Sequence, residues 1–224
     1  MPVMLPETPV PLALRNPPRR QWTRSEREQL EGLGLLNGER WELIEGELLL
    51  ELPKKRPHVQ ALAILTGWLI SIFGDWFVNA EAPIDVAPED NPTSEPEPDL
   101  IVLRPEYDPW KTTPQAQDVL LAIEVSETTF EFDNTVKAGL YARAGLREYW
   151  VVDLNGRRLI VHRNPAGGRY QSIVAYGEGE HARPLAALAA AIAVSRIFGE
   201  PETHGSGGSE RRRVRVRAAH HASE

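Results

Sequence analysis

The sequence of 224 residues contains no cysteine. This absence excludes a disulfide scaffold, a cysteine-ligated zinc site and a cysteine nucleophile. It fits a reducing compartment, and we expect a cytoplasmic protein. Long apolar runs are also lacking, because the most apolar stretch, residues 59–73, is interrupted by polar residues. It is shorter than the roughly 20 residues that a membrane-spanning helix needs, so we expect no contact with a membrane.

Basic residues are fewer than acidic residues. The chain has 25 Lys and Arg against 32 Asp and Glu, a formal net charge of −7. This balance argues against broad, non-specific coating of nucleic acid. It leaves room for an enzyme that meets nucleic acid through a metal ion and a local basic rim. Apolar residues make up 42% of the chain, which is enough for a packed core and excludes wholesale disorder.

Composition divides the chain into three parts. Six prolines among the first 18 residues predict a disordered N-terminal arm over residues 1–20. A stretch rich in Gly, Ser and Arg predicts a flexible tail over residues 201–224. Residues 21–200 are then one folded domain, of a size that a single core supports.

Helix and strand signals alternate within the folded part. Thr23 and Glu26 form a capping box that predicts a helix to about Leu33, and residues 40–51 predict a hairpin. Further helices are expected over residues 58–73, 130–144 and 184–198, and further strands over residues 76–86, 100–103, 119–125, 148–153, 158–163 and 170–176. This order predicts an α/β (α+β) fold in which helices flank a mixed central β-sheet.

Two acidic residues stand at strand ends. Asp99 comes directly before the strand 100–103, and Glu124 lies at the end of a buried strand. If these strands are neighbours, the two carboxylates converge at one edge of the sheet, where they repel each other unless a cation lies between them. Hard oxygen ligands suit Mg²⁺, which takes one or two carboxylates together with substrate phosphate. Lys137, in the next helix, would then orient or activate a metal-bound water.

The same residues have an ordinary interpretation. Acids at strand ends commonly just meet solvent, and Asp133 and Lys137 have the spacing of a surface ion pair on a helix. Short motif matches of this kind often arise without function, so spacing alone leaves both interpretations open.

Several short segments follow one another in a fixed order. They are WELIEGE at 41–47, HVQ at 58–60, PDL at 98–100, IEVS at 123–126, Asp133 with Lys137, YARAG at 141–145 and EYWVVD at 148–153. Together they resemble the Uma-type (Uma-two) endonuclease family of the PD-(D/E)XK restriction-endonuclease-like superfamily, over about residues 38–198. The resemblance implies a restriction-endonuclease-like core and metal-dependent cleavage of nucleic-acid phosphodiester bonds.

The resemblance also implies roles for single residues. Asp99 matches the first acid of the superfamily motif and Glu124 the second, so these two would hold Mg²⁺ or Mn²⁺. The motif lysine belongs two residues after Glu124, where this chain has Ser126. Serine supplies no positive charge, and the resemblance moves the lysine role to Lys137. Asp99, Glu124 and Lys137 are therefore the expected catalytic residues.

Other residues are weaker candidates or belong to the core. Glu42 would face the metal from the hairpin. His58 begins a helix, where a histidine is more often a capping or packing residue than a ligand. Trp68, Trp76 and Trp150 lie in apolar elements and are expected in the core.

Three functions remain open at this point. The first is a Mg²⁺-dependent endonuclease that acts on nucleic acid, DNA rather than RNA, for which a homodimer would allow both strands of a duplex to be cut. The second is a nuclease-fold protein without catalysis that binds nucleic acid or another partner, as Ser126 and the acidic net charge suggest. The third is a metal-dependent phosphodiesterase for a small substrate. The first requires Lys137 to point into the cleft that holds Asp99 and Glu124.

Overall fold

A computed structural model describes residues 19–36, 38–108, 110 and 112–199. Apart from residues 19 and 20, the predicted arm over residues 1–20 and tail over residues 201–224 lie outside the described residues. The centre is a six-stranded sheet of β3 (Val78–Ala80), β4 (Leu100–Leu103), β5 (Val119–Ser126), β6 (Glu148–Asp153), β7 (Arg158–Ala166) and β8 (Arg169–Gly177), in that spatial order. Strands β5 and β6 are parallel, and the other neighbours are antiparallel. The predicted mixed sheet is confirmed.

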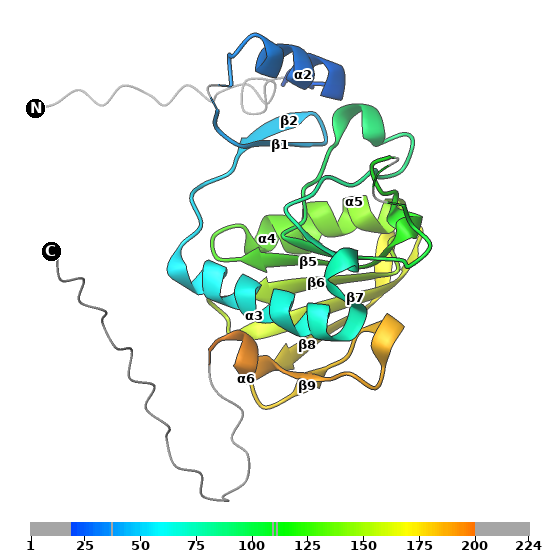
Figure 1. Cartoon of the computed structure of the whole chain (residues 1–224). Coiled ribbons are helices and arrows are strands. Elements are labelled where there is room, and N and C mark those ends of the chain that lie inside the picture. The colour runs from blue at the N-terminus through cyan, green and yellow to red at the C-terminus, as the bar shows by residue number, and fades with distance from the viewer. Residues whose placement is uncertain (1–18, 37, 109, 111, 200–224) are drawn as a thin grey trace, which may run out of the picture.

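The other elements surround this sheet (Figure 1). They are α2 (Arg24–Gly32), the hairpin of β1 (Trp41–Ile44) and β2 (Glu47–Leu50), α3 (Arg56–Phe73), α4 (Phe130–Phe132), α5 (Ala138–Arg143), the pair β9 (His181–Ala182) and β10 (Ile192–Ala193), and α6 (Val194–Ile197). The capping box that the sequence predicts at the start of α2 is present, with Thr23 and Glu26 bonded to each other's backbone. No helix in the described part is long and apolar enough to cross a membrane.

The sheet separates two apolar layers. On one face, residues of α3 and α6 pack with Ile123 and Val125 of β5, and Trp68 stacks on Trp150 at 6.1 Å between ring centroids. On the other face, residues of α5 pack with Ala122 of the same strand. Since alternate residues of a strand point to opposite faces, the side chains of residues 124 and 126 belong to the α5 face.

The connection between β5 and β6 places functional candidates over the sheet. Parallel strands need a crossover, and here it consists of α4, a π-helical turn over Asp133–Lys137, and α5. Strand β5 is buried along nearly its whole length, as its apolar sequence predicts. The helix expected over residues 130–144 is therefore confirmed, with the π-helical turn as an added feature.

Two expected elements are wrong in extent. Only Val78–Ala80 of the strand expected over residues 76–86 pairs with β4, because the 3₁₀ turn Asp75–Phe77 precedes it and Glu81, with a φ of 52°, ends the extended backbone. The helix expected over residues 184–198 is replaced by the 3₁₀ turn Leu185–Ala187, strand β10 and the four-residue α6. Alanine-rich composition favours a helix there, but burial of Ile192 and Val194 and the pairing of β10 with β9 outweigh local propensity.

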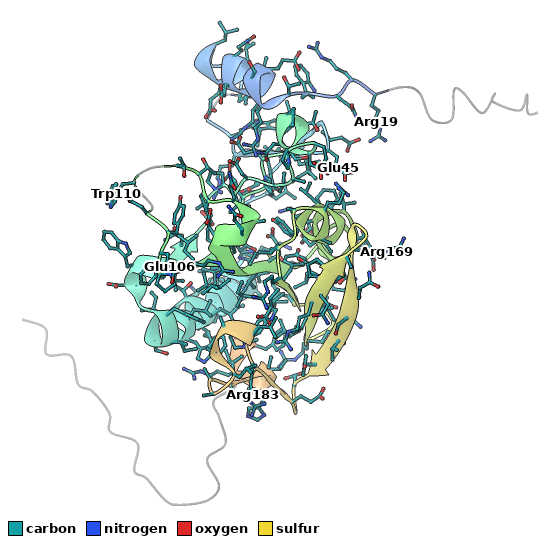
Figure 2. All side chains as sticks on the ribbon, turned by 90° about the vertical axis from the view of Figure 1, so that its right-hand side faces the viewer. Arg19, Glu45, Glu106, Trp110, Arg169 and Arg183 are labelled. Carbon is teal, nitrogen blue, oxygen red and sulfur yellow. The ribbon has the colours of Figure 1, made fainter. Side chains whose placement is uncertain are left out.

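The prediction that Trp76 lies in the core is wrong. Its side chain is 55% exposed, and its ring lies 6.2 Å from that of Trp110. Figure 2 shows Trp110 at the outer edge of the molecule. The chain leaves α3 at Gly74, which has a positive φ of 88°, so the residues that follow no longer continue the buried face of that helix.

Candidate functional site

One cavity collects most of the candidate residues. It has a volume of about 260 Å³ and lies among the β1–β2 hairpin, the start of α3, the end of β5 and the π-helical turn. Five of the candidates line it: Glu42, His58, Asp99, Glu124 and Lys137. The sixth, Ser126, is fully buried and is not part of the lining.

The register of the sheet brings the two predicted acids together. Leu100 pairs with Ile123 in the antiparallel β4–β5 ladder, and continuing this register by one residue places Asp99 opposite Glu124. The backbone N–H of Val125 donates a hydrogen bond of 2.8 Å to Oδ2 of Asp99. The convergence of these two residues at one edge of the sheet is thus present in the structure.

Asp99 is a buried carboxylate held by three donors. Besides the N–H of Val125, Nε2 of His58 lies 3.2 Å from Oδ2, and Nζ of Lys54 lies 2.7 Å from Oδ1. Burial alone raises the pKa of Asp99, but the hydrogen bond and charge of His58 and the charge of Lys54 lower it to about 2. Asp99 is therefore ionised at neutral pH.

Glu124 shares its Oε1 atom with two donors. Nζ of Lys137 lies 2.9 Å away and the hydroxyl of Tyr141 lies 3.2 Å away. Burial raises the pKa of Glu124 well above its usual value, and the negative charges of Asp133, Asp99 and Glu42 add to this, while Lys137 opposes it. The site thus favours a cation or a proton on Glu124.

Lys137 is buried between two carboxylates. Its Nζ atom lies 2.8 Å from Oε1 of Glu42 and 2.9 Å from Oε1 of Glu124, and only 5% of the residue is exposed. Burial lowers the pKa of Lys137, but its acidic neighbours outweigh this and raise the pKa well above its usual value. Oε1 of Glu42 also accepts the N–H of Glu97 at 2.9 Å. The hairpin residue Glu42 therefore contacts Lys137.

The alternative of a surface ion pair between Asp133 and Lys137 is wrong. Both residues are buried, and Asp133 accepts hydrogen bonds at Oδ2 from Ser126 at 2.7 Å and Thr129 at 2.6 Å. Asp133 begins the π-helical turn and Lys137 ends it, and such turns often occur at functional sites. Ser126, at the position where the resemblance expects a lysine, thus contacts Asp133 at the start of the turn that carries Lys137.

A buried histidine contacts the same π-helical turn. His162 of β7 is 1% exposed, and its Nε2 lies 2.9 Å from Oδ1 of Asn134 in the π-helical turn. The rings of Tyr149 and Tyr170 lie 5.4 Å from its ring. The hydroxyl of Tyr149 also donates to the backbone carbonyl of Asp133 at 3.0 Å.

Because of His162, we expect the free energy of unfolding to decrease in mild acid. Burial lowers the pKa of His162 to about 4, whereas an unfolded histidine titrates near 6.5. Between these values the unfolded chain binds a proton that the folded chain does not, so stability falls as pH drops from 6.5 to 4, by up to about 3 kcal/mol. Urea unfolding at several pH values measures this slope, and His162→Gln should reduce it. Equal slopes in both proteins would contradict the assignment.

The sequence does not indicate two residues of the site. Tyr141 belongs to the YARAG motif, which does not show that its hydroxyl reaches Glu124. No sequence pattern assigns a role to Lys54, whose ammonium contacts both Asp99 and Glu81. The basic run of residues 54–56 before a helix was the one available signal for Lys54, and it does not reveal a partner 45 residues away.

The donor set fits a hard divalent cation. Within residues 19–36, 38–108, 110 and 112–199, no three His, Asp or Glu side chains form a ready-made metal site. Asp99 and Glu124 nevertheless supply carboxylate oxygens at one cavity, and no hydrogen bond from the described residues reaches Oε2 of Glu124. Seven carboxylates line the cavity against three ammonium groups, an excess of negative charge: Glu42, Glu51, Glu97, Asp99, Glu124, Glu127 and Asp133 against Lys54, Lys55 and Lys137. Mg²⁺ or Mn²⁺, which retain waters and need few protein ligands, suit this arrangement.

Comparison with models of protein families shows to which family the chain belongs. Residues 25–195 match the Uma2 family, which is described as "Putative restriction endonuclease". The chain belongs to the Uma2 family. This confirms the resemblance inferred from the ordered motifs, since the match includes all of the segments that carry it.

A solved structure supports the fold of this Uma2 chain. It is the crystal structure of a putative nuclease belonging to DUF820 from Anabaena variabilis ATCC 29413, with a TM-score of 0.59 and 15% sequence identity. The alignment covers 79% of this chain and 97% of that chain. At this identity the likeness establishes a shared fold. A search of curated proteins finds no match.

Proposed function

We propose that this Uma2 protein is a Mg²⁺- or Mn²⁺-dependent endonuclease whose centre contains Asp99, Glu124 and Lys137. The observation that carries the proposal is the contact of 2.9 Å between Lys137 and Glu124 inside the cavity that Asp99 also lines. A lysine beside two carboxylates is the chemistry that the superfamily motif requires. Here the lysine comes from the crossover helix instead of the position that Ser126 occupies.

Asp99 and Glu124 are the residues that would hold the cation. Asp99 supplies a charged ligand because its pKa is about 2, and strand β5 fixes its orientation through the N–H of Val125. When bound, a divalent cation lowers the pKa of a water molecule and neutralises charge on a phosphoryl oxygen.

Lys137 serves as a positive charge and a hydrogen-bond donor. Because Glu42 and Glu124 raise its pKa, its amine keeps its proton at neutral pH and does not act as a general base. The protonated amine orients the attacking water and offsets negative charge that develops on the phosphate. Glu42 is a positioning residue, because its Oε1 atom lies 2.8 Å from the amine of Lys137 that also contacts Glu124.

His58 is a positioning residue for Asp99. Its Nε2 lies 3.2 Å from Oδ2, while Oδ1 faces Lys54. The histidine is 8% exposed and begins the long helix α3, so it ties the carboxylate to a rigid element. This interaction resembles the outer-shell contacts that orient ligands in metal sites.

The assay that tests the proposal uses several substrates and metals. Supercoiled plasmid, single-stranded DNA, RNA and bis(p-nitrophenyl) phosphate are each incubated with Mg²⁺, Mn²⁺ or EDTA. We expect metal-dependent nicking of DNA that EDTA abolishes. Cleavage of the small diester alone would favour a phosphodiesterase, and no cleavage of any substrate by metal-loaded protein would favour a binding module with a nuclease fold.

A further inference from the structure

Lys54 lines the candidate site and contacts two carboxylates. It lies in the irregular linker between β2 and α3, and its ammonium contacts Oδ1 of Asp99 at 2.7 Å. The same ammonium contacts Glu81, which in turn pairs with Arg40. Lys54 lines the cavity, whereas Glu81 lies outside its lining. The amine thus stands between the site and a second acidic partner.

The two oxygens of Asp99 are held in different ways. Oδ2 accepts the backbone N–H of Val125, which belongs to a central strand, and contacts the buried ring of His58. Among the described residues, the hydrogen-bond and ion-pair partner of Oδ1 is the side chain of Lys54, which is 25% exposed. Oδ1 is therefore the oxygen of Asp99 that a single side-chain movement can free for another cation.

The amine of Lys54 also has a second carboxylate with which it can stay paired after it leaves Asp99. Glu81 already binds its amine, and the side chain of Glu81 is 33% exposed. Moving the ammonium away from Asp99 therefore leaves it paired instead of buried without a partner, which lowers the cost of the movement.

Resting on the proposed metal site, we propose that Lys54 is a built-in competitor for the divalent cation at Asp99. The ammonium and the cation repel each other and exclude each other from Oδ1. Binding of the cation displaces Lys54 toward Glu81, and the Asp99–Lys54 pair sets the cation concentration at which the site fills. Removing the amine therefore tightens cation binding.

Lys55 provides a matched control. It is the next residue, it lines the same cavity, and it carries the same charge. Its side chain is 65% exposed and pairs with Glu127 at 3.0 Å. Replacing Lys55 changes the net charge as much as replacing Lys54 does, so the comparison separates direct competition from general electrostatic attraction.

The experiment measures the dissociation constant of Mn²⁺ alone, from the electron paramagnetic resonance signal of free Mn²⁺. The proteins are wild type, Lys54→Met and Lys55→Met, with Lys54→Gln as a second variant and thermal unfolding to verify folding. The contribution of a partly exposed ion pair corresponds to an affinity change of up to about fivefold. We expect Lys54→Met and Lys54→Gln to bind Mn²⁺ about fivefold more tightly than wild type, and Lys55→Met to differ by less than about twofold.

A double-mutant test locates the effect. In an Asp99→Asn background, Lys54→Met should no longer change the residual affinity for Mn²⁺, because the competition takes place at Asp99. Equal affinities of Lys54→Met and Lys55→Met, together with loss of Mn²⁺ binding in Asp99→Asn, would overturn the role of Lys54 and leave the metal site standing. Absence of Mn²⁺ binding in all proteins would overturn both proposals.

Discussion

The Glu124→Gln variant is expected to cleave DNA at least about a thousandfold more slowly than wild type in Mg²⁺. Glutamine keeps the shape of the side chain and an oxygen that can accept from Lys137 and Tyr141, which contact Oε1 in the wild type. It removes the negative charge that a divalent cation requires of this ligand. The fold should therefore persist while the reaction fails.

The measurement is the single-turnover rate of plasmid nicking, with thermal unfolding as the test of folding. Glu127→Gln is the matched control, because Glu127 lines the same cavity three residues later but pairs with the exposed Lys55. We expect this control to retain the wild-type rate within about a factor of three, since a partly exposed ion pair contributes little. Wild-type rates in a folded Glu124→Gln variant would contradict the assignment of Glu124.

The Lys137→Met variant is expected to lose about 3–5 kcal/mol of unfolding free energy at pH 7. Methionine fills a similar volume, but it leaves Glu42 and Glu124 buried without the amine that contacts both. An uncompensated buried charge is far more costly than the loss of a surface ion pair. The same variant should lose DNA cleavage wherever it remains folded.

The pH dependence of this loss identifies its cause. Burial and neighbouring acids already raise the pKa of Glu124, and removing the ammonium removes the opposing effect. The folded variant therefore binds protons that the unfolded chain releases, so its deficit relative to wild type shrinks as pH falls. Urea unfolding of both proteins from pH 8 to pH 5 measures the deficit. A deficit that does not change with pH would indicate lost packing instead of unpaired charge.

Much of the sheet could be predicted because its signals are local. The apolar run of β5 indicated a strand buried on both faces, and the capping box marked the start of α2. The sequence alone does not show that β4 and β5 are neighbours, and the convergence of Asp99 and Glu124 depends on this. In the structure the two strands pair in an antiparallel register that places Asp99 opposite Glu124.

The partners of the site could not be read from the sequence in the same way. The four-residue spacing of Asp133 and Lys137 left open a surface ion pair as well as a site residue at Lys137. In the structure both side chains are buried and have separate partners, Ser126 and Thr129 for Asp133, and Glu42 and Glu124 for Lys137. Lys54 lies in an irregular linker without periodicity, and its partners depend on the tertiary fold. Local patterns carry no information on such contacts.

The most direct test of the account is the position of Mn²⁺ in crystals of the wild-type protein, located by anomalous X-ray scattering. We expect a peak between the carboxylates of Asp99 and Glu124, with the amine of Lys137 still in contact with Glu124. Mn²⁺ bound elsewhere, or a cavity without Mn²⁺ at concentrations that support DNA cleavage, would contradict the assignment of this cavity as the nuclease centre.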